Sequence, residues 1–320
     1  MRRVVSGESI DRETNLSIAL RNCNLNVVNA SGVTIHVLEP HDLTYLDGRS
    51  VMIVVAHADD AALFCGGTIA AMSRAGARMT LVRVTNDDTD SVGLSPTETV
   101  DRNARELALA ASILGIGTIC NFGYPSDQMS DVPEVELRER LIRVMREIKP
   151  FAVLTFDPHG GGGEDNQDHL RVAQAMDEAF WTSMFDKHHP EHFDVGLAPH
   201  GVVERWYFAR PPSQVSHIVD TSQVLDAKCD AAAQHTTMLG NLVEQLHLMA
   251  KTEGRELPRL ADIGEDLPNF IRSLVRAGAE ATGAKYEVPA AEEFRRVRYS
   301  GFEDVVNYLE QHYLNQKGDG

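Results

Sequence analysis

VMIVVAHADDAALFCGG, residues 51–67, joins a run of apolar residues to three polar side chains and a glycine pair. Residues 51–56 predict a buried strand, because short apolar runs rich in β-branched residues are typical of parallel sheets. His57, Asp59 and Asp60 follow where that strand ends. Polar side chains at this point predict a ligand site, because loops beyond the carboxyl ends of parallel strands lead into helix N-termini.

Outward from this stretch, strand and helix patterns alternate, which predicts an α/β fold with a Rossmann-like, mainly parallel sheet flanked by helices. Further strands are expected at 79–84, 118–122, 151–156, 202–208 and 215–219, and helices at 67–75, 100–114, 134–148 and 170–185. Residues 222–249 are expected to form one long helix or two joined at Gly240, followed by C-terminal helices at 267–281 and 302–313.

The first 48 residues do not follow this alternation. LNVVNASGVTIHV, residues 25–37, predicts a hairpin that turns at 29–32 and lies outside the main α/β unit. We expect residues 1–48 to be an N-terminal extension that covers a face or joins subunits. Residues 49–320 are expected to form a single catalytic domain.

Composition excludes several classes of partner. The 30 basic and 47 acidic residues give a formal net charge of −17, which repels a phosphate backbone and anionic lipid. No apolar run approaches the roughly 18 residues that span a bilayer, and the N-terminus lacks the apolar segment of a secretory signal. The four cysteines include no CxxC pair. We expect a cytoplasmic protein with reduced thiols, without nucleic acid or membrane as partner, and compatible with a homo-oligomer.

A second polar loop follows the strand expected at 151–156. TFDPHGGGGEDNQDH, residues 155–169, brings His159, Asp168 and His169 to the same edge of the sheet as the first loop. The glycine run at 160–163 lacks the frame of a phosphate-binding or dinucleotide-binding motif and is more typical of a mobile loop that covers a substrate.

The two loops together predict a metal site. His57 and Asp60 are three residues apart and can face one point, while Asp59 between them faces elsewhere. Two imidazole nitrogens and one carboxylate bind Zn²⁺ and leave a position for water. Asp59 would act as general base when metal-bound water attacks a carbonyl group. By itself the first loop is better explained by helix capping and a hydrogen-bonded structural histidine, so the inference depends on the second loop.

Two motifs resemble those of the PIG-L/LmbE family of zinc-dependent de-N-acetylases. AHADDAALFCGGT resembles the family's AHPDDE…GGT, and DNQDH resembles its HPDH motif. The resemblance continues in the family's order through TLVRVTNDD, RELALAASILGI, FGYPSD, AKCDAAAQHTTM and EEFRRVR, and covers residues 51 to about 298.

The resemblance implies metal ligands at His57, Asp60 and His169 and a general base at Asp59. The implied cofactor is Zn²⁺, with Fe²⁺ or Co²⁺ as alternatives. The family hydrolyses amides, usually the N-acetyl group of an amino sugar or its conjugate. The expected function is therefore metal-dependent N-deacetylation of a small N-acetylated sugar or conjugate, within residues 49–320.

One departure from the family concerns the oxyanion. The histidine that relatives carry three positions before the last ligand is Asn166 here. An amide can donate a hydrogen bond to an oxyanion, but it cannot carry a proton. Proton delivery to the leaving amine would then fall to Asp59, or to His159 or His235, each of which is equally explained as a structural histidine. We expect Asp168 to orient His169 or Asn166.

The sequence gives weaker support for residues that contact the substrate. Arg102, or Arg105 on the same helix, occupies a region where relatives carry a substrate-binding arginine. Asp87 follows the second strand and could line the pocket or bind metal, although turn chemistry explains it equally well.

Two alternatives remain: a non-catalytic carbohydrate-binding or regulatory protein, and a Mg²⁺-dependent phosphate-ester hydrolase. The second is disfavoured by two histidine ligands. No Gly-x-Ser-x-Gly elbow supports covalent catalysis.

Overall fold

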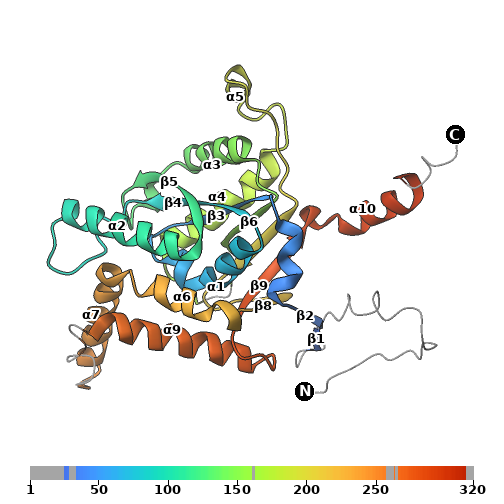
Figure 1. Ribbon diagram of the computed structural model, residues 1–320. Helices are drawn as coiled ribbons and strands as arrows, with labels where there is room; N and C mark the ends of the chain where they lie inside the picture. The colour runs from blue at the N-terminus through green and yellow to red at the C-terminus, as the bar shows by residue number, and fades with distance from the viewer. Residues whose placement is uncertain (1–24, 29–33, 161–162, 257–262, 264–265, 315–320) are drawn as a thin grey trace, which may run out of the picture.

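The computed structural model describes residues 25–28, 34–160, 163–256, 263 and 266–314. Within them, strands form one sheet in the order β1-β2-β8-β9-β7-β6-β3-β4-β5 (Figure 1). The strands are β1 Leu25–Val28, β2 Thr34–Leu38, β3 Ser50–Val55, β4 Arg78–Thr85, β5 Ile116–Tyr124, β6 Ala152–Phe156, β7 Glu204–Phe208, β8 His217–Asp220 and β9 Ala291–Arg298.

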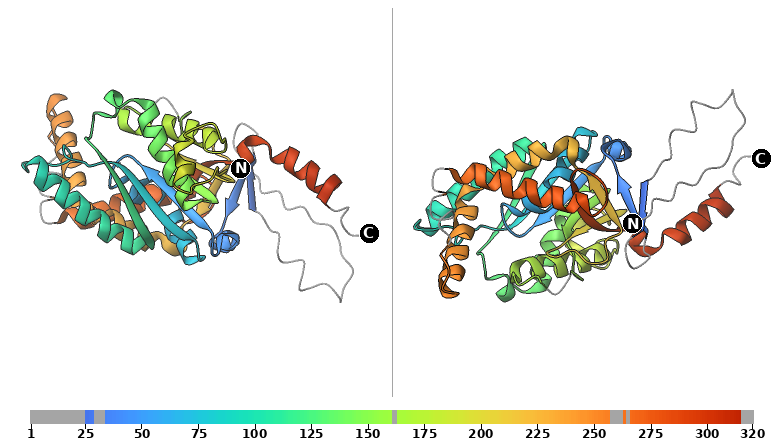
Figure 2. Two further views of the ribbon diagram at one scale, coloured as in Figure 1. Left: turned by 90° about the horizontal axis from the view of Figure 1, so that it is seen from above. Right: turned by 90° about the horizontal axis from the view of Figure 1, so that it is seen from below.

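Helices cover both faces of the sheet, as the sequence predicts. They are α1 Asp60–Arg74, α2 Pro96–Leu114, α3 Glu134–Ile148, α4 Gln167–Thr182, α5 Glu191–Asp194, α6 Leu225–Ala232, α7 Thr236–Thr252, α9 Leu267–Ala284 and α10 Glu303–Leu309. Helices α3 and α4 pack together on one face, and α1, α2 and α6 lie on the other with α9 against α6 (Figures 1 and 2). Helix α10 extends away from this body (Figure 2). The expected α/β class and the C-terminal helices are confirmed.

The centre of the sheet is parallel, because β5, β4, β3, β6 and β7 pair in the same direction. Strand β9 is antiparallel to both of its neighbours, β7 and β8, and so joins the two halves of the sheet. The sequence analysis missed this strand, since its segment EEFRRVR has no apolar alternation. Its charges are instead neutralised in the fold, for example by the pairing of Arg295 with Asp157.

The helix predicted from residue 67 begins seven residues earlier, at Asp60, and bends at Cys65 (φ −140°, ψ 20°). The bend frees two backbone N–H groups, and Glu292 of β9 accepts both, from Gly67 at 2.8 Å and from Thr68 at 2.7 Å. A Cβ at Gly67 would lie 2.6 Å from the Thr221 side chain. The glycine pair therefore allows close packing inside a helix and does not mark its start.

Two other boundaries differ from expectation. Helix α2 begins at Pro96, four residues early, because Ser95 and Glu98 form a capping box before it. The long C-terminal segment does divide into two helices, but not at Gly240, which lies inside α7. The break falls between Ala232 and Thr236, where the backbone of His235 leaves helical geometry (φ −82°, ψ 54°).

The expected hairpin strands are present, since β1 and β2 pair antiparallel, while the expected turn at 29–32 lies outside the described residues. Strand β2 also pairs in parallel with β8. The hairpin is thus the edge of the main sheet, which corrects the expectation that it lies outside it. The division at residue 48 into an extension and one domain stays a prediction. Among the described residues, no helix is long and apolar enough to cross a membrane.

Candidate active site

The two polar loops meet because the strands that precede them are neighbours. Strands β3 and β6 pair in parallel, with Val51 opposite Ala152. Their carboxyl ends therefore lie side by side and deliver His57 from the loop after β3, Asp60 from the first turn of α1, and His169 from the first turn of α4. All three residues are buried.

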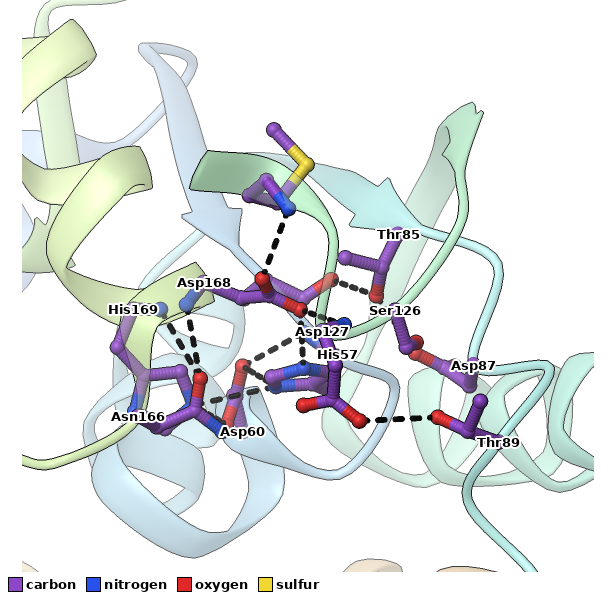
Figure 3. A network of polar contacts seen from close by, with 12 residues as sticks. His57, Asp60, Thr85, Asp87, Thr89, Ser126, Asp127, Asn166, Asp168 and His169 are labelled. Carbon is purple, nitrogen blue, oxygen red and sulfur yellow. Dashed lines mark hydrogen bonds and ion pairs between the residues drawn. The ribbon is translucent and has the colours of Figure 1, made fainter. Parts of the chain in front are cut away.

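The three side chains converge on one point, as the sequence predicts (Figure 3). Nδ1 of His57 lies 3.1 Å from Nε2 of His169. The carboxylate of Asp60 lies 3.2 Å from Nε2 of His169 and 3.6 Å from Nδ1 of His57. It also accepts a hydrogen bond of 2.7 Å from the backbone N–H of His57, which fixes its direction. Two ring nitrogens and one carboxylate oxygen form the donor set of a divalent transition-metal site.

The outer nitrogen of each ring is held by a second carboxylate. Nε2 of His57 lies 3.2 Å from Oδ2 of Asp168, and Nδ1 of His169 lies 3.0 Å from Oε2 of Glu164. A carboxylate accepts hydrogen bonds, so each outer nitrogen donates its proton there, which leaves each inner nitrogen to present its lone pair when a cation occupies the shared centre. This arrangement is typical of metal-binding histidines.

Asp168 therefore orients His57 and not His169 or Asn166, which corrects our expectation. Its carboxylate is fixed by the backbone N–H groups of Asp127 at 2.7 Å and Met129 at 3.2 Å (Figure 3). The partner of His169, Glu164, was not singled out in the sequence, because its loop was interpreted only as a cover. The sequence did contain a signal for this role, because Glu164 is an acidic residue shortly before the candidate ligand His169.

The electrostatics of the centre favour positive charge. Burial opposes protonation of His57, but hydrogen bonds to Asp168 and Asp60 outweigh it and raise the pKa of the ring well above its ordinary value. Burial is likewise outweighed at His169, where the charge of Asp60 raises the pKa to about 9. Burial, and then the charge of Asp60, raise the pKa of Asp59 to about 7. A cation at the centre would relieve this excess of negative charge.

A cavity of about 430 Å³ opens onto the converging side chains. Its polar floor also includes Asp59, Asp90, Asn166 and Arg210. Helices α7 and α9 form the opposite wall. Asp90, Arg210 and this wall were missed by the sequence analysis, because nothing in the local pattern indicates that they pack over strands far away in the chain.

Asp59 differs from the other acids of the first loop. It is half-buried at the N-cap position of α1, yet its side chain makes no capping hydrogen bond. It lines the cavity beside Asp60, whose carboxylate is held by the His57 backbone N–H. Asp59 therefore presents a carboxylate to the cavity that its own helix does not use.

Asn166 lines the cavity and also caps α4. Its side-chain oxygen accepts hydrogen bonds from the backbone N–H groups of Asp168 at 2.9 Å and His169 at 3.4 Å. Because the oxygen is committed to the cap, the side-chain NH₂ group is the part that is left to act as a donor.

The two remaining histidine candidates do not line the cavity. His159 is exposed. His235 is fully buried, and neither ring nitrogen has a hydrogen-bond partner among the described residues. Burial lowers its pKa to about 4, so its ring is neutral, and it lies outside the cavity lining. This placement gives no support for proton delivery by His159.

The two substrate-contact candidates also lie apart from the floor. Asp87 is fully buried and accepts from Arg83 at 2.8 Å and from the Thr85 hydroxyl at 2.7 Å, so its carboxylate serves the fold. Arg102 lines a separate groove of about 300 Å³. That groove shares Asn241 with the main cavity. Of these two candidates, Arg102 is therefore the one that lies near the cavity.

Comparison with known proteins agrees with this geometry. Residues 52–180 match the GlcNAc-PI de-N-acetylase family, PIG-L. A 1D-myo-inositol 2-acetamido-2-deoxy-alpha-D-glucopyranoside deacetylase of Kineococcus radiotolerans is 30% identical over 178 residues, which are 43% of this chain and 47% of the relative. The match thus spans about half the length of that relative.

Solved structures extend the likeness over more of the chain. The N,N'-diacetylchitobiose deacetylase of Pyrococcus horikoshii superposes with a TM-score of 0.64 at 22% identity, over 80% of this chain and 88% of that one. A 4-carboxy-2-hydroxymuconate hydratase of Pseudomonas putida KT2440 gives 0.56 at 18% identity, over 78% and 96%. At these identities the structures show the fold alone, and this fold serves more than one reaction.

Proposed function

We propose that this protein is a metal-dependent amide hydrolase that removes an N-acetyl or related N-acyl group from an amino sugar or its conjugate, because residues 52–180 match the GlcNAc-PI de-N-acetylase family. The observation that carries the proposal is the convergence of His57, Asp60 and His169 beneath a cavity that the carboxylate of Asp59 also lines. The named activity of the Kineococcus relative supports the choice of an N-acetylated sugar.

The side chains present fit a metal ion. The inner nitrogens of His57 and His169 face each other at 3.1 Å while both outer nitrogens are held by carboxylates. Zn²⁺ matches this set of two nitrogens and one oxygen, and Fe²⁺ and Co²⁺ accept the same set. A bound ion of this kind polarises an acyl oxygen and lowers the pKa of water to about 7.

Proton transfer falls to Asp59. Its carboxylate reaches the cavity without a capping hydrogen bond, whereas Asp60 is held by His57 and His169. In the proposed reaction Asp59 takes the proton of the attacking water and then returns it to the nitrogen of the leaving amine. Asn166 donates from its side-chain NH₂ group to the developing oxyanion, an interaction worth about 2.7–4 kcal/mol in enzymes that use such a donor.

The proposal includes small, N-acetylated partners in the cytoplasm. The formal net charge of −17 supports the exclusion of nucleic acid and anionic lipid as partners. A homo-oligomer is compatible with the sequence.

The deciding experiment measures release of primary amine from a panel of N-acetylated sugars and conjugates by the Zn²⁺-loaded protein. Detecting amine, and not only loss of substrate, separates hydrolysis from hydration. His57→Ala should lose bound metal, measured by plasma mass spectrometry, together with activity. The matched variant His159→Ala removes an exposed histidine outside the cavity and should keep both.

Retention of the wild-type metal content by His57→Ala would contradict the site. Binding of sugars without any release of amine would instead favour a non-catalytic carbohydrate-binding protein.

A further inference from the structure

The two sides of the active-site cavity differ in polarity. The floor is formed by the converging histidines and acids, whereas the wall is formed by α7 and α9. Leu242 and Leu246 of α7 face the cavity together with Phe270 and Leu274 of α9, and Leu63 and Phe64 of α1 extend the apolar surface toward the floor. An apolar surface thus begins directly beside the acids that carry the proposed chemistry.

Few polar groups interrupt this wall. Among the described residues of α7 and α9 that line the cavity, only Asn241 and Gln245 can form side-chain hydrogen bonds. A bare amino sugar carries hydroxyl groups on every side, and burying a hydroxyl against leucine without a hydrogen-bond partner is unfavourable. The wall is therefore unsuited to a small, fully polar sugar.

The wall also leaves large apolar side chains partly in water. Leu242 is 39% exposed and Leu274 is 54% exposed, and both line the cavity. A ligand that covers them removes apolar surface from water on both sides of the contact, which favours an apolar ligand group. This surface lines the same cavity as Asp59 and Asp60, so a molecule whose amide reaches those carboxylates also contacts it.

We propose, on the basis of the function inferred above, that the substrate is amphiphilic: its amide lies on the polar floor, and an alkyl or aryl group packs between α7 and α9. That group can belong to the amine side, as the aglycone of an amino sugar, or to the acyl side, as an N-acyl chain longer than acetyl. Both sources present the same chemistry to the wall.

Turnover of three probes tests the proposal: N-acetylglucosamine, octyl N-acetyl-β-glucosaminide and N-octanoylglucosamine, each below its aggregation concentration. Each buried methylene is worth about fourfold in affinity, so at least one amphiphile should have a kcat/KM on the order of 100-fold above that of N-acetylglucosamine. Release of acetate or octanoate shows which side carries the apolar group. Equal kcat/KM for all three probes would overturn the proposal.

Variants of the wall sharpen this test. Leu242→Asn and Leu274→Asn should each lower the preference for the amphiphile by about 10-fold, because a polar side chain replaces apolar contact surface. Leu248→Asn is the matched control, since Leu248 is 65% exposed on the same helix α7 but does not line the cavity. It should keep the preference of the wild type, and an equal loss in this variant would argue against a specific wall.

A binding measurement separates the proposal from the inferred reaction. Titration calorimetry on the Zn²⁺-loaded protein would compare octyl β-glucosaminide with glucosamine and octanoate with acetate. If none of the three amides is hydrolysed, the proposed function fails, yet tighter binding of an octyl compound that is lost in Leu274→Asn still supports the apolar site. Equal binding within both pairs overturns it.

Discussion

Two buried groups of charges in this protein differ in what neutralises them. Where β7 meets β9, Glu204 pairs with Arg296 and accepts hydrogen bonds from Tyr45 at 2.7 Å and Trp206 at 3.0 Å. At the active site, the side chain of Asp59 caps nothing, and Oδ2 of Asp90 has no partner among the described residues. Glu204 is paired with an arginine within the chain, although Nε of Arg296 has no hydrogen-bond partner among the described residues, whereas Asp59 and Asp90 form no such ion pair there.

The histidines of the two regions differ in the same way. Burial, followed by the charges of Arg296 and His36, lowers the pKa of His217 to about 3, so this ring is neutral. Carboxylates raise the pKa of His57 and His169 at the active site despite burial. Burial alone therefore does not identify a functional site. An incompletely neutralised cluster of charges beside a cavity does.

The largest effect is expected for Asp59→Asn. This change removes the proposed base but keeps the shape of the side chain, so turnover should fall by about 10²–10⁴-fold while metal content is kept. Steady-state kinetics and metal analysis measure the two quantities. Asp88→Asn is the matched control, because Asp88 accepts a hydrogen bond from the Ser126 backbone N–H, which an amide oxygen can replace. Full activity in Asp59→Asn would remove the base from the scheme.

Glu204→Ala should act on stability and not on chemistry. It leaves Arg296, whose side chain is 13% exposed, without its partner, which should lower the free energy of unfolding by about 3–5 kcal/mol in denaturant titration. Glu303→Ala breaks the more exposed pair with Arg298 and should cost at most about 1 kcal/mol. Similar losses of unfolding free energy in both variants would show that the ion pair of Glu204 stabilises the fold no more than an exposed ion pair does.

Glu164→Gln should weaken metal binding by about 10–100-fold, because the carboxylate that fixes the His169 ring is lost. Competition with a chelator of known affinity measures this change. Asp165→Asn alters an exposed neighbouring acid and should leave the affinity unchanged. An unchanged metal affinity in Glu164→Gln would show that this carboxylate does not support metal binding through His169.

The smallest effect concerns pH. The pKa of His217 is about 3 in the folded protein, below the ordinary value of about 6.5, so the unfolded chain binds the extra proton as pH falls. Stability from this ring is complete above pH 6.5 and is lost progressively toward pH 3.

Between pH 7 and pH 5.5 this one group should contribute a loss of about 1 kcal/mol, which His217→Gln should remove. Denaturant titrations of both proteins at the two pH values measure the difference. The ring also contacts Ser216 at 2.9 Å, and a side-chain amide can replace that hydrogen bond. An unchanged pH dependence in the variant would show that the ring is not kept neutral.

The sequence predicts the parallel core and the convergence of His57, Asp60 and His169, because the ligands stand at the ends of strongly apolar strands. It does not predict β9, whose Glu and Arg side chains find their partners only in the folded sheet. The early start of α1 was missed because two acids and a glycine pair are typical of a loop.

The rest of the site depends on packing between distant segments. No sequence motif marks Asp90, Glu164 or Arg210. Their positions at the site depend on how their loops pack in the folded protein. The apolar wall is invisible in the sequence for another reason. The apolar stripes of α7 and α9 look like ordinary core-facing helix surfaces, and only the fold shows that part of each stripe faces a cavity.

The bent helix α1 has a consequence for how the chain can be shortened. All three candidate ligands lie before residue 180, within the segment that matches the family. The carboxylate that receives the two freed N–H groups of α1 belongs to Glu292, near the end of the sheet-forming chain, and Lys228 neutralises it. A fragment that ends after α4 would keep all three candidate ligands but would lose the Glu292 carboxylate that accepts hydrogen bonds at the bend of α1. We therefore expect the smallest functional fragment to extend at least through β9.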